Sequence, residues 1–145
     1  MILAPSYPAT LFEPSPLVDL SAKAERERLS PAAIKAFVNI MEKWHVRDED
    51  ARTLLGGISN GRFYDMKKKP ERTLDADTLA RISYLVGIFK ALNVLYSKTP
   101  AAAWMQRPNA NRIFGGRTPL AYMMKGGLPA MQIVRRLVDA RRSGM

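Results

Sequence analysis

Apolar residues recur every three or four positions through most of the chain after about residue 30. Ile34, Phe37, Met41 and Trp44 keep the spacing of one face of a helix. The same spacing over 79–96 predicts the longest helix, with Asp75 as its N-cap because a carboxylate accepts from free amides of a first turn. No stretch alternates apolar and polar residues as a half-buried strand would. The pattern therefore predicts an all-α fold, a small helix bundle.

Start and stop signals divide the first half of this pattern into helices. Ser30-Pro31 predicts the start of the first ordered helix, since serine caps a first turn and proline fits the first helical position. A short helix is predicted over 48–55, with acidic residues at its positive N-terminal end, and Gly56-Gly57 ends it. Ser59 begins a third helix, which stops before Pro70.

The second half shows the same signature of a threonine followed by a proline. Thr99-Pro100 and Thr118-Pro119 each predict a helix start, and a loop over 106–117 separates the two helices. Gly126-Gly127 halts the second of them, and a last helix is predicted over 129–142. The second half is thus expected to be a compact helical domain.

The N-terminal segment has a different texture. Residues 1–29 contain four of the ten prolines, which remove backbone donors and fix φ, so no regular element fits before Pro16. We expect a mobile arm there, with at most a short helix over 22–28. The predicted organisation is an arm at 1–29, a first helical domain at 30–98 and a second at 99–145.

Charge is distributed unevenly. The net charge is +10 and the isoelectric point is about 10.2. Up to Asp77 the chain has 12 Lys/Arg against 12 Asp/Glu, whereas after it 11 Lys/Arg stand against one acid, Asp139. Such asymmetry indicates an anionic partner: nucleic acid, a membrane surface or an acidic cleft on another protein. A solvated basic surface without a partner is the alternative interpretation.

The composition argues against catalysis. There is no cysteine and His45 is the only histidine, so thiolate chemistry and a zinc site lack their ligands. Gly115-Gly116 is not followed by the Gly-Lys-Ser of a phosphate-binding loop, and no nucleophile elbow is present. We therefore expect no catalytic residue, no metal and no cofactor. No uninterrupted apolar run approaches a membrane span and the N-terminus does not resemble a signal peptide, so the expected location is the cytoplasm, away from membranes.

The order of a short helix, a glycine turn and another helix at 48–69 is typical of a helix-turn-helix unit. The second helix of such a unit enters the major groove with its N-terminal residues at the base edges. Lysines at its end would contact phosphates, which position the protein without reading sequence. The predicted DNA-binding residues are Ser59, Asn60, Arg62, Tyr64, Lys67, Lys68 and Lys69.

A structural interpretation of the same residues stays open. Small helix bundles commonly contain short helices joined by glycine turns, and a lysine run is usually a solvated helix end. Gly61 also lies inside the proposed recognition helix, where glycine costs about 1 kcal/mol relative to alanine.

Several short motifs occur in a recognisable order along the chain. In the first half these are Leu54-Leu55-Gly56, the aromatic pair Phe63-Tyr64 and the segment 79–82. In the second half they are Trp104, Pro108-Asn109, Phe114-Gly115-Gly116, Thr118-Pro119-Leu120 and Gly126-Gly127. The first set resembles the Xre-like half of the Xre/MbcA/ParS antitoxin family, and the second resembles, in order and spacing, the toxin-binding domain of that family. Gly57, a second glycine in the turn, and residues 1–29 depart from the pattern.

The resemblance implies a function. Antitoxins of this kind belong to type II toxin–antitoxin systems and pair with RES-domain toxins, which degrade NAD or use it to ADP-ribosylate a target. The C-terminal domain covers the NAD pocket of the toxin, and the helix-turn-helix acts as a repressor of the shared operon. The implied partners are therefore a RES-domain toxin and operator DNA.

Two further expectations accompany this function. A homodimer is expected because operators mirror protein two-fold symmetry, and the apolar helix over 75–97 offers surface for it. The alternative function is a stand-alone helix-turn-helix transcriptional regulator with a C-terminal dimerisation domain. The predicted toxin-binding residues are Asn109, Gly115, Gly116, Arg117, Thr118, Arg135, Arg136, Arg141 and Arg142.

Overall fold

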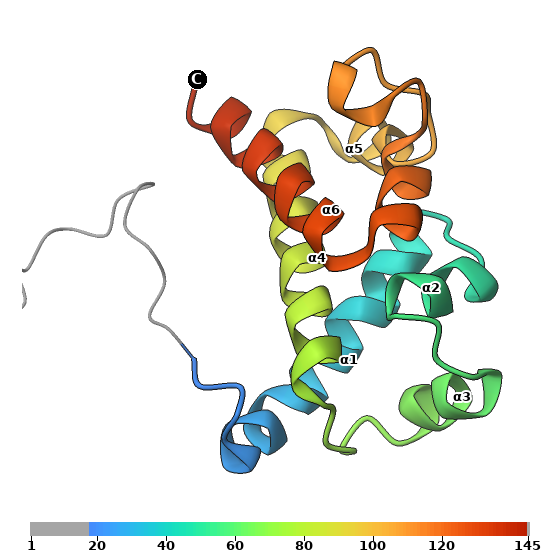
Figure 1. Ribbon diagram of the computed structural model, residues 1–145, viewed down its shortest axis with the longest axis vertical. Coiled ribbons are helices and arrows are strands. Elements are labelled where there is room, and N and C mark those ends of the chain that lie inside the picture. The colour runs from blue at the N-terminus through green and yellow to red at the C-terminus, as the bar shows by residue number, and fades with distance from the viewer. Residues whose placement is uncertain (1–17, 145) are drawn as a thin grey trace, which may run out of the picture.

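The computed structural model describes residues 18–144, and within them it is all-helical with no strand, which confirms the predicted fold class (Figure 1). The first 17 residues of the expected arm lie outside the described residues. The helices are α1 (Lys23–Lys43), α2 (Asp48–Leu54), α3 (Asn60–Lys68), α4 (Ala76–Leu95), α5 (Lys98–Trp104), the 3-10 turn η1 (Arg112–Phe114) and α6 (Pro119–Arg142).

The prediction that the first helix begins at Ser30-Pro31 was wrong. Helix α1 begins at Lys23 and passes through Pro31. Ser30 is not an N-cap: its hydroxyl donates to the Arg26 carbonyl at 2.6 Å and accepts from the Leu74 amide at 2.8 Å. The serine therefore ties α1 to the segment before α4, a contact 44 residues away in sequence that no local signal reveals. Pro31 removes one helical hydrogen bond, to the carbonyl of exposed Glu27, where water can replace the donor.

Helix α4 lies at the centre of the bundle and packs against α1 on one side and α6 on the other (Figure 1). Its buried face includes Ile82, Leu85, Ile88 and Leu92. By length and composition alone α4 could cross a membrane. The expectation that no apolar run is long enough did not foresee this, because Arg81 interrupts the apolar sequence of the helix. Because α4 packs between two other helices, burial in the core of the bundle also explains its apolar residues.

The predicted N-caps at Asp75 and Thr118 are confirmed. The Asp75 carboxylate accepts from the Thr78 amide at 2.7 Å, and the Thr118 hydroxyl accepts from the Ala121 amide at 3.0 Å. The expected break at Gly126-Gly127 is confirmed, because α6 consists of two helical segments that meet at a kink there. Gly127 has φ 64° and ψ −145°, and the helix resumes in a new direction towards its end at Arg142.

The two halves of the chain share one core. Met131, Val134 and Val138 of α6 are buried, and α6 packs against α4. A division of the chain at residues 29 and 98 stays a prediction.

Candidate functional sites in the helix-turn-helix and the C-terminal loop

The segment from α2 to α3 has the geometry of a helix-turn-helix. The Gly56 and Gly57 amides donate to carbonyls of the last turn of α2, at Thr53 and Arg52. Both glycines have positive φ, 96° and 81°, a region that side chains disfavour. The second glycine, a departure from the family pattern, is therefore what this turn requires. The Arg52 side chain then spans the turn and donates to the Ile58 carbonyl at 3.1 Å.

Helix α3 begins as predicted at Ser59, whose hydroxyl accepts from the Arg62 amide at 3.1 Å. The Ser59 side chain is therefore the N-cap of α3. Phe63 and Met66 are buried, which fixes the direction of the rest of the helix. With about 100° between residues, the face opposite these two side chains carries Gly61, Tyr64, Asp65 and Lys68, and Asn60 lies at its edge.

The other predicted DNA-binding residues lie on the two edges of that face. Arg62 lies on the Asp75 side, close enough for its charge to act on that carboxyl group. Lys67 lies on the opposite edge, where its ammonium is 3.3 Å from the Asp48 carboxylate and 4.6 Å from the Phe63 ring centroid. Lys69, the C-cap of α3, is exposed. Contact of these residues with DNA stays a prediction.

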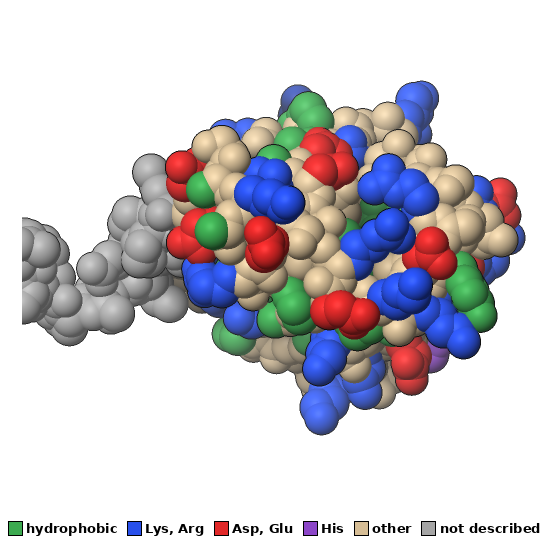
Figure 2. Space-filling view, turned by 90° about the horizontal axis from the view of Figure 1, so that it is seen from below, with side chains coloured by type: hydrophobic (Ala, Val, Ile, Leu, Met, Phe, Trp, Pro, Cys, Tyr) green, Lys and Arg blue, Asp and Glu red, His purple; other side chains and the backbone are tan. Residues whose placement is uncertain are grey.

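Acidic residues at the start of α2 shape the potential around α3. Asp48, Glu49 and Asp50 occupy its first turn, where they stabilise the helix dipole. Arg47 pairs with Asp50 at 3.3 Å. Figure 2, which views the molecule from below, shows basic side chains interspersed with acidic ones. The N-terminal end of α2 is therefore unfavourable for DNA phosphates, which leaves α3 as the basic element of the unit.

The Asp75 cap links this unit to α4. Burial opposes ionisation of Asp75, but hydrogen bonds from the Thr78 amide and hydroxyl, together with the charges of Arg62 and Arg26, lower the pKa of its carboxyl group below the usual value. The carboxylate is therefore the stable form of this cap.

The segment 106–118, here called the arginine loop, is held by its own hydrogen bonds. The Asn109 amide donates to the Arg117 carbonyl at 3.3 Å, which brings the two sides of the loop together. The Asn109 side chain accepts from the Asn111 amide, and the Asn111 side chain accepts from the Ile113 amide. The second of these bonds makes Asn111 the N-cap of η1, and the first forms a tight turn ahead of it.

An aromatic cluster anchors the arginine loop to the bundle. Phe114 is fully buried, and its ring meets those of Trp104 and Tyr122 edge to face, with centroids 5.9 and 5.3 Å apart. Edge-to-face pairs of this kind contribute about 0.5–1.5 kcal/mol beyond burial. The loop is therefore a preorganised surface feature rather than a flexible linker.

The structure sorts the predicted residues of this loop into two groups. Asn109 and Thr118 direct their side-chain oxygens to backbone amides within the chain, so they build the loop. Arg117 is exposed beside Gly115 and Gly116. Sequence reasoning missed three exposed neighbours, although the recurrence of arginine every five residues was a visible signal: Arg107, Arg112 and Ile113.

The predicted arginines of the last helix also divide. Arg135 donates through Nε to the Asp139 carboxylate at 2.8 Å, and Arg142 approaches the same group at 3.7 Å. Arg136 and Arg141 are exposed. Two of the four arginines thus surround the one acid that follows Asp77, and toxin contact by any of them stays a prediction.

A helix-turn-helix within a small helical bundle is typical of DNA-binding proteins. Residues 23–87 match the model of the antitoxin Xre-like helix-turn-helix domain, and residues 90–144 match that of the antitoxin Xre/MbcA/ParS C-terminal toxin-binding domain. The chain therefore belongs to the Xre/MbcA/ParS antitoxin family, which confirms the resemblance and marks it as a regulatory, non-enzymatic protein.

One curated relative is similar to this protein along most of the chain. "Uncharacterized protein y4oB" of Sinorhizobium fredii (strain NBRC 101917 / NGR234) is 36% identical over 115 residues, which cover 79% of this chain and 87% of that protein. No solved structure matches the chain. The family implies a toxin as partner and DNA binding through the helix-turn-helix.

Proposed function

We propose that this antitoxin silences a RES-domain toxin by covering its NAD pocket and represses its own operon as a homodimer. The observation that carries the proposal is the arginine loop, which lies inside the region that matches the toxin-binding model. Arg107, Arg112 and Arg117 are exposed there, and none of them forms an ion pair within residues 18–144. Their guanidinium groups are available to a partner.

The physical chemistry of the loop suits a binding surface. Arginine pairs with carboxylates through a planar two-point fork and is enriched among residues that dominate interface affinity. Ile113, 37% exposed, adds an apolar contact between two arginines. Because hydrogen bonds and buried Phe114 already order the loop, little conformational entropy is lost on binding. Gly115 and Gly116 allow close backbone approach, and Arg136 and Arg141 extend the basic surface.

The location of the loop favours simultaneous binding of toxin and DNA. Figure 1 shows the segment between α5 and α6 at one end of the molecule and α3 at the other. Antitoxins of this family pair with RES-domain toxins, which consume NAD, so the pocket that we propose to be covered is an NAD pocket. Acidic side chains around such a catalytic pocket would attract arginines. The toxin-binding match also favours an antitoxin over a stand-alone regulator. Val94 of α4, 67% exposed, supports a dimer contact.

Co-expression with the product of the adjacent toxin gene tests this function. The variant carries Arg107→Ala, Arg112→Ala and Arg117→Ala together, and the matched control is Arg28→Ala, an exposed arginine of α1. We expect the control to protect growth and cellular NAD, and the triple variant to lose most protection while it folds normally by circular dichroism. Full protection by the triple variant would contradict the assigned surface. Growth arrest without any fall in NAD or any ADP-ribosylated protein would contradict the RES chemistry.

A further inference from the structure

Helix α3 begins with an asparagine followed by a glycine, a pair that occurs once in the chain. Asn60 and Gly61 are both exposed. A Cβ built at Gly61 would meet no atom within 4 Å, so the space beside its backbone nitrogen is open. Gly61 has no positive φ and no close neighbour, the two usual reasons for a glycine at a fixed position. Because glycine disfavours a helix, its presence here calls for another reason.

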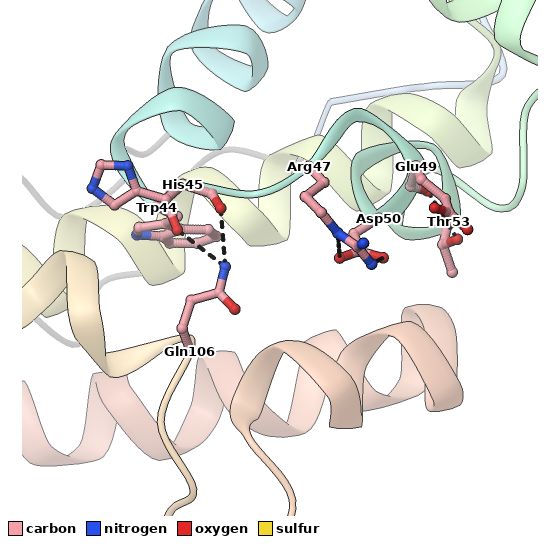
Figure 3. Close-up of polar contacts among 7 residues, drawn as sticks. All are labelled: Trp44, His45, Arg47, Glu49, Asp50, Thr53 and Gln106. Carbon is pink, nitrogen blue, oxygen red and sulfur yellow. Dashed lines mark hydrogen bonds and ion pairs between the residues drawn. The ribbon is translucent and has the colours of Figure 1, made fainter.

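The side-chain amides of the C-terminal half show what protects such a group. The Gln106 amide nitrogen donates to two carbonyls at the end of α1, at 3.3 and 3.2 Å (Figure 3). Asn109 and Asn111 accept from backbone amides of the arginine loop. The capping bond at the start of α3 uses the Ser59 hydroxyl instead, and within residues 18–144 no hydrogen bond holds the Asn60 side chain. Its amide group is therefore free to react.

We propose that Asn60-Gly61 is a self-modifying site, at which the asparagine loses its amide nitrogen without an enzyme. The backbone nitrogen of Gly61, after it gives its proton to solvent, attacks Cγ of Asn60. Ammonia leaves with a proton from solvent, and a five-membered imide remains. One water molecule then opens the imide at either carbonyl, which yields aspartate or isoaspartate. The net reaction exchanges ammonia for water and needs no oxidant, reductant or cofactor.

The start of α3 favours this reaction electrostatically and limits it by its cap. The Gly61 amide lies in the first turn, where it has no helical acceptor. No acidic residue is present in that turn, so the positive end of the helix dipole stabilises the deprotonated nitrogen. Ring closure requires Asn60 to leave the helical backbone geometry, which occurs when the helix end frays. The 3.1 Å bond from the Arg62 amide to the Ser59 hydroxyl opposes fraying and therefore sets the rate.

The consequence for the operator rests on the proposed function. An aspartate at the first position of α3 is compatible with the helix dipole, so the fold is retained. An asparagine both donates to and accepts from adenine, whereas a carboxylate only accepts and is repelled by phosphates. Isoaspartate adds a backbone atom and displaces the start of the helix. Operator binding is thus lost with the age of the molecule, while the arginine loop at the other end is unchanged (Figure 1).

Peptide mass spectrometry during incubation of the full chain at mildly alkaline pH tests the reaction without DNA. Trypsin places Asn60 in the peptide 53–62 and Asn93 in the peptide 91–98. Asn93 is the internal control, since it is exposed in α4 but is followed by branched Val94, which hinders the attack. We expect aspartate and isoaspartate at Asn60 while Asn93 stays intact. Equal conversion at the two sites, or none at Asn60, would overturn the proposal.

Two variants test the geometry of the site. Ser59→Ala removes the cap and should speed the reaction about fivefold, the factor that an ordinary N-cap contributes to the helical state. Gly61→Ala hinders the attack and favours the helix, so it should slow the reaction by about fivefold or more. The matched control is Thr118→Ala, which removes the cap of α6 and should leave the rate at Asn60 unchanged. With folding checked by circular dichroism, an unchanged rate in either variant, or equal acceleration in the control, contradicts the proposed chemistry.

Operator affinity tests the consequence, with a duplex from the region upstream of the gene as the probe. Asn60→Asp reproduces one product and should bind the duplex about 5- to 160-fold more weakly, the factor of one paired base contact. Gln132→Glu, the same amide-to-acid change at an exposed position of α6, should bind normally. Operator affinity equal to wild type in Asn60→Asp refutes the regulatory consequence. Failure of the unmodified wild type to bind the duplex contradicts the proposed function instead, and mass spectrometry alone then decides whether the site modifies itself.

Discussion

Gly87 and Arg135 offer a test of how the two halves pack. A Cβ built at Gly87 of α4 would lie 1.9 Å from Nη1 and 2.1 Å from Cζ of Arg135, far inside van der Waals contact. The clash is with the flexible end of a side chain, so Gly87→Ala moves the guanidinium rather than the backbone. Arg135 must then leave Asp139, whose Oδ1 is already buried without a hydrogen bond among the described residues.

Two opposing contributions set the size of the effect. Replacement of a mid-helix glycine by alanine favours the helix by about 1 kcal/mol. Loss of the half-exposed pair between Arg135 and Asp139, with the packing of the arginine stem on α4, costs about 1 kcal/mol. We expect Gly87→Ala alone to leave the free energy of unfolding within about 0.5 kcal/mol of wild type. In an Arg135→Ala background the clash is gone, and the same change should stabilise by about 1 kcal/mol.

Urea denaturation of the four proteins of this double-mutant cycle measures the difference. The expected interaction energy between the two sites is about 1 kcal/mol, within the range of about 0.5–3 kcal/mol usual for residues in direct contact. Equal stabilisation by Gly87→Ala in both backgrounds would refute the close approach of α6 to α4 at this position, and with it the role of Arg135 in the interface between the halves.

Three further predictions concern other elements. Asn60→Ala or Tyr64→Ala should reduce the preference for the operator over random DNA, by about 1–3 kcal/mol for a paired base contact. Lys69→Ala should instead weaken binding to all DNA sequences alike and flatten the salt dependence of the affinity. Gel shifts across a salt series distinguish these effects. Asp75→Ala should cost about 1 kcal/mol of stability at neutral pH. Since the folded pKa of Asp75 is lowered, this contribution is present above the unfolded value of 3.8 and is lost as pH falls through the folded pKa, so the difference in urea midpoint should vanish in acid. Light scattering at micromolar concentration should give the mass of a dimer, and a strict monomer would contradict the proposed oligomer.

The sequence predicted what local chemistry determines. Ser59, Asp75 and Thr118 cap helices as expected, because an N-cap bonds only to amides two or three residues ahead. Ser30 looks the same in sequence but bonds to Leu74, 44 residues away, and α1 continues through it. A proline after a serine is thus a weaker signal than the tertiary contact that overrides it.

The same distinction between local and tertiary contacts applies to the candidate sites. The glycines of the turn and the arginines of the C-terminal half are visible in the sequence, but the partners of those arginines are not. Arg135 lies on Gly87 and Arg81 lies between Gly56 and Gly127, contacts that depend on how α4 and α6 pack. Arg107 and Arg112 were overlooked because helical periodicity, from which exposure was judged elsewhere, does not apply in a loop, although arginine recurs there every five residues.

The placement of the two candidate surfaces at opposite ends of the molecule has a practical consequence for surface-based binding assays. In Figure 1 the chain leaves α6 near the end that carries the arginine loop, whereas α1 begins at the end where α3 lies. Attachment to a sensor chip through the C-terminus therefore presents α3 to DNA in solution and brings the loop towards the matrix. Attachment ahead of α1 presents the loop instead. A single immobilised format would under-report one of the two partners, so the two attachments should be compared before any ratio of affinities is interpreted.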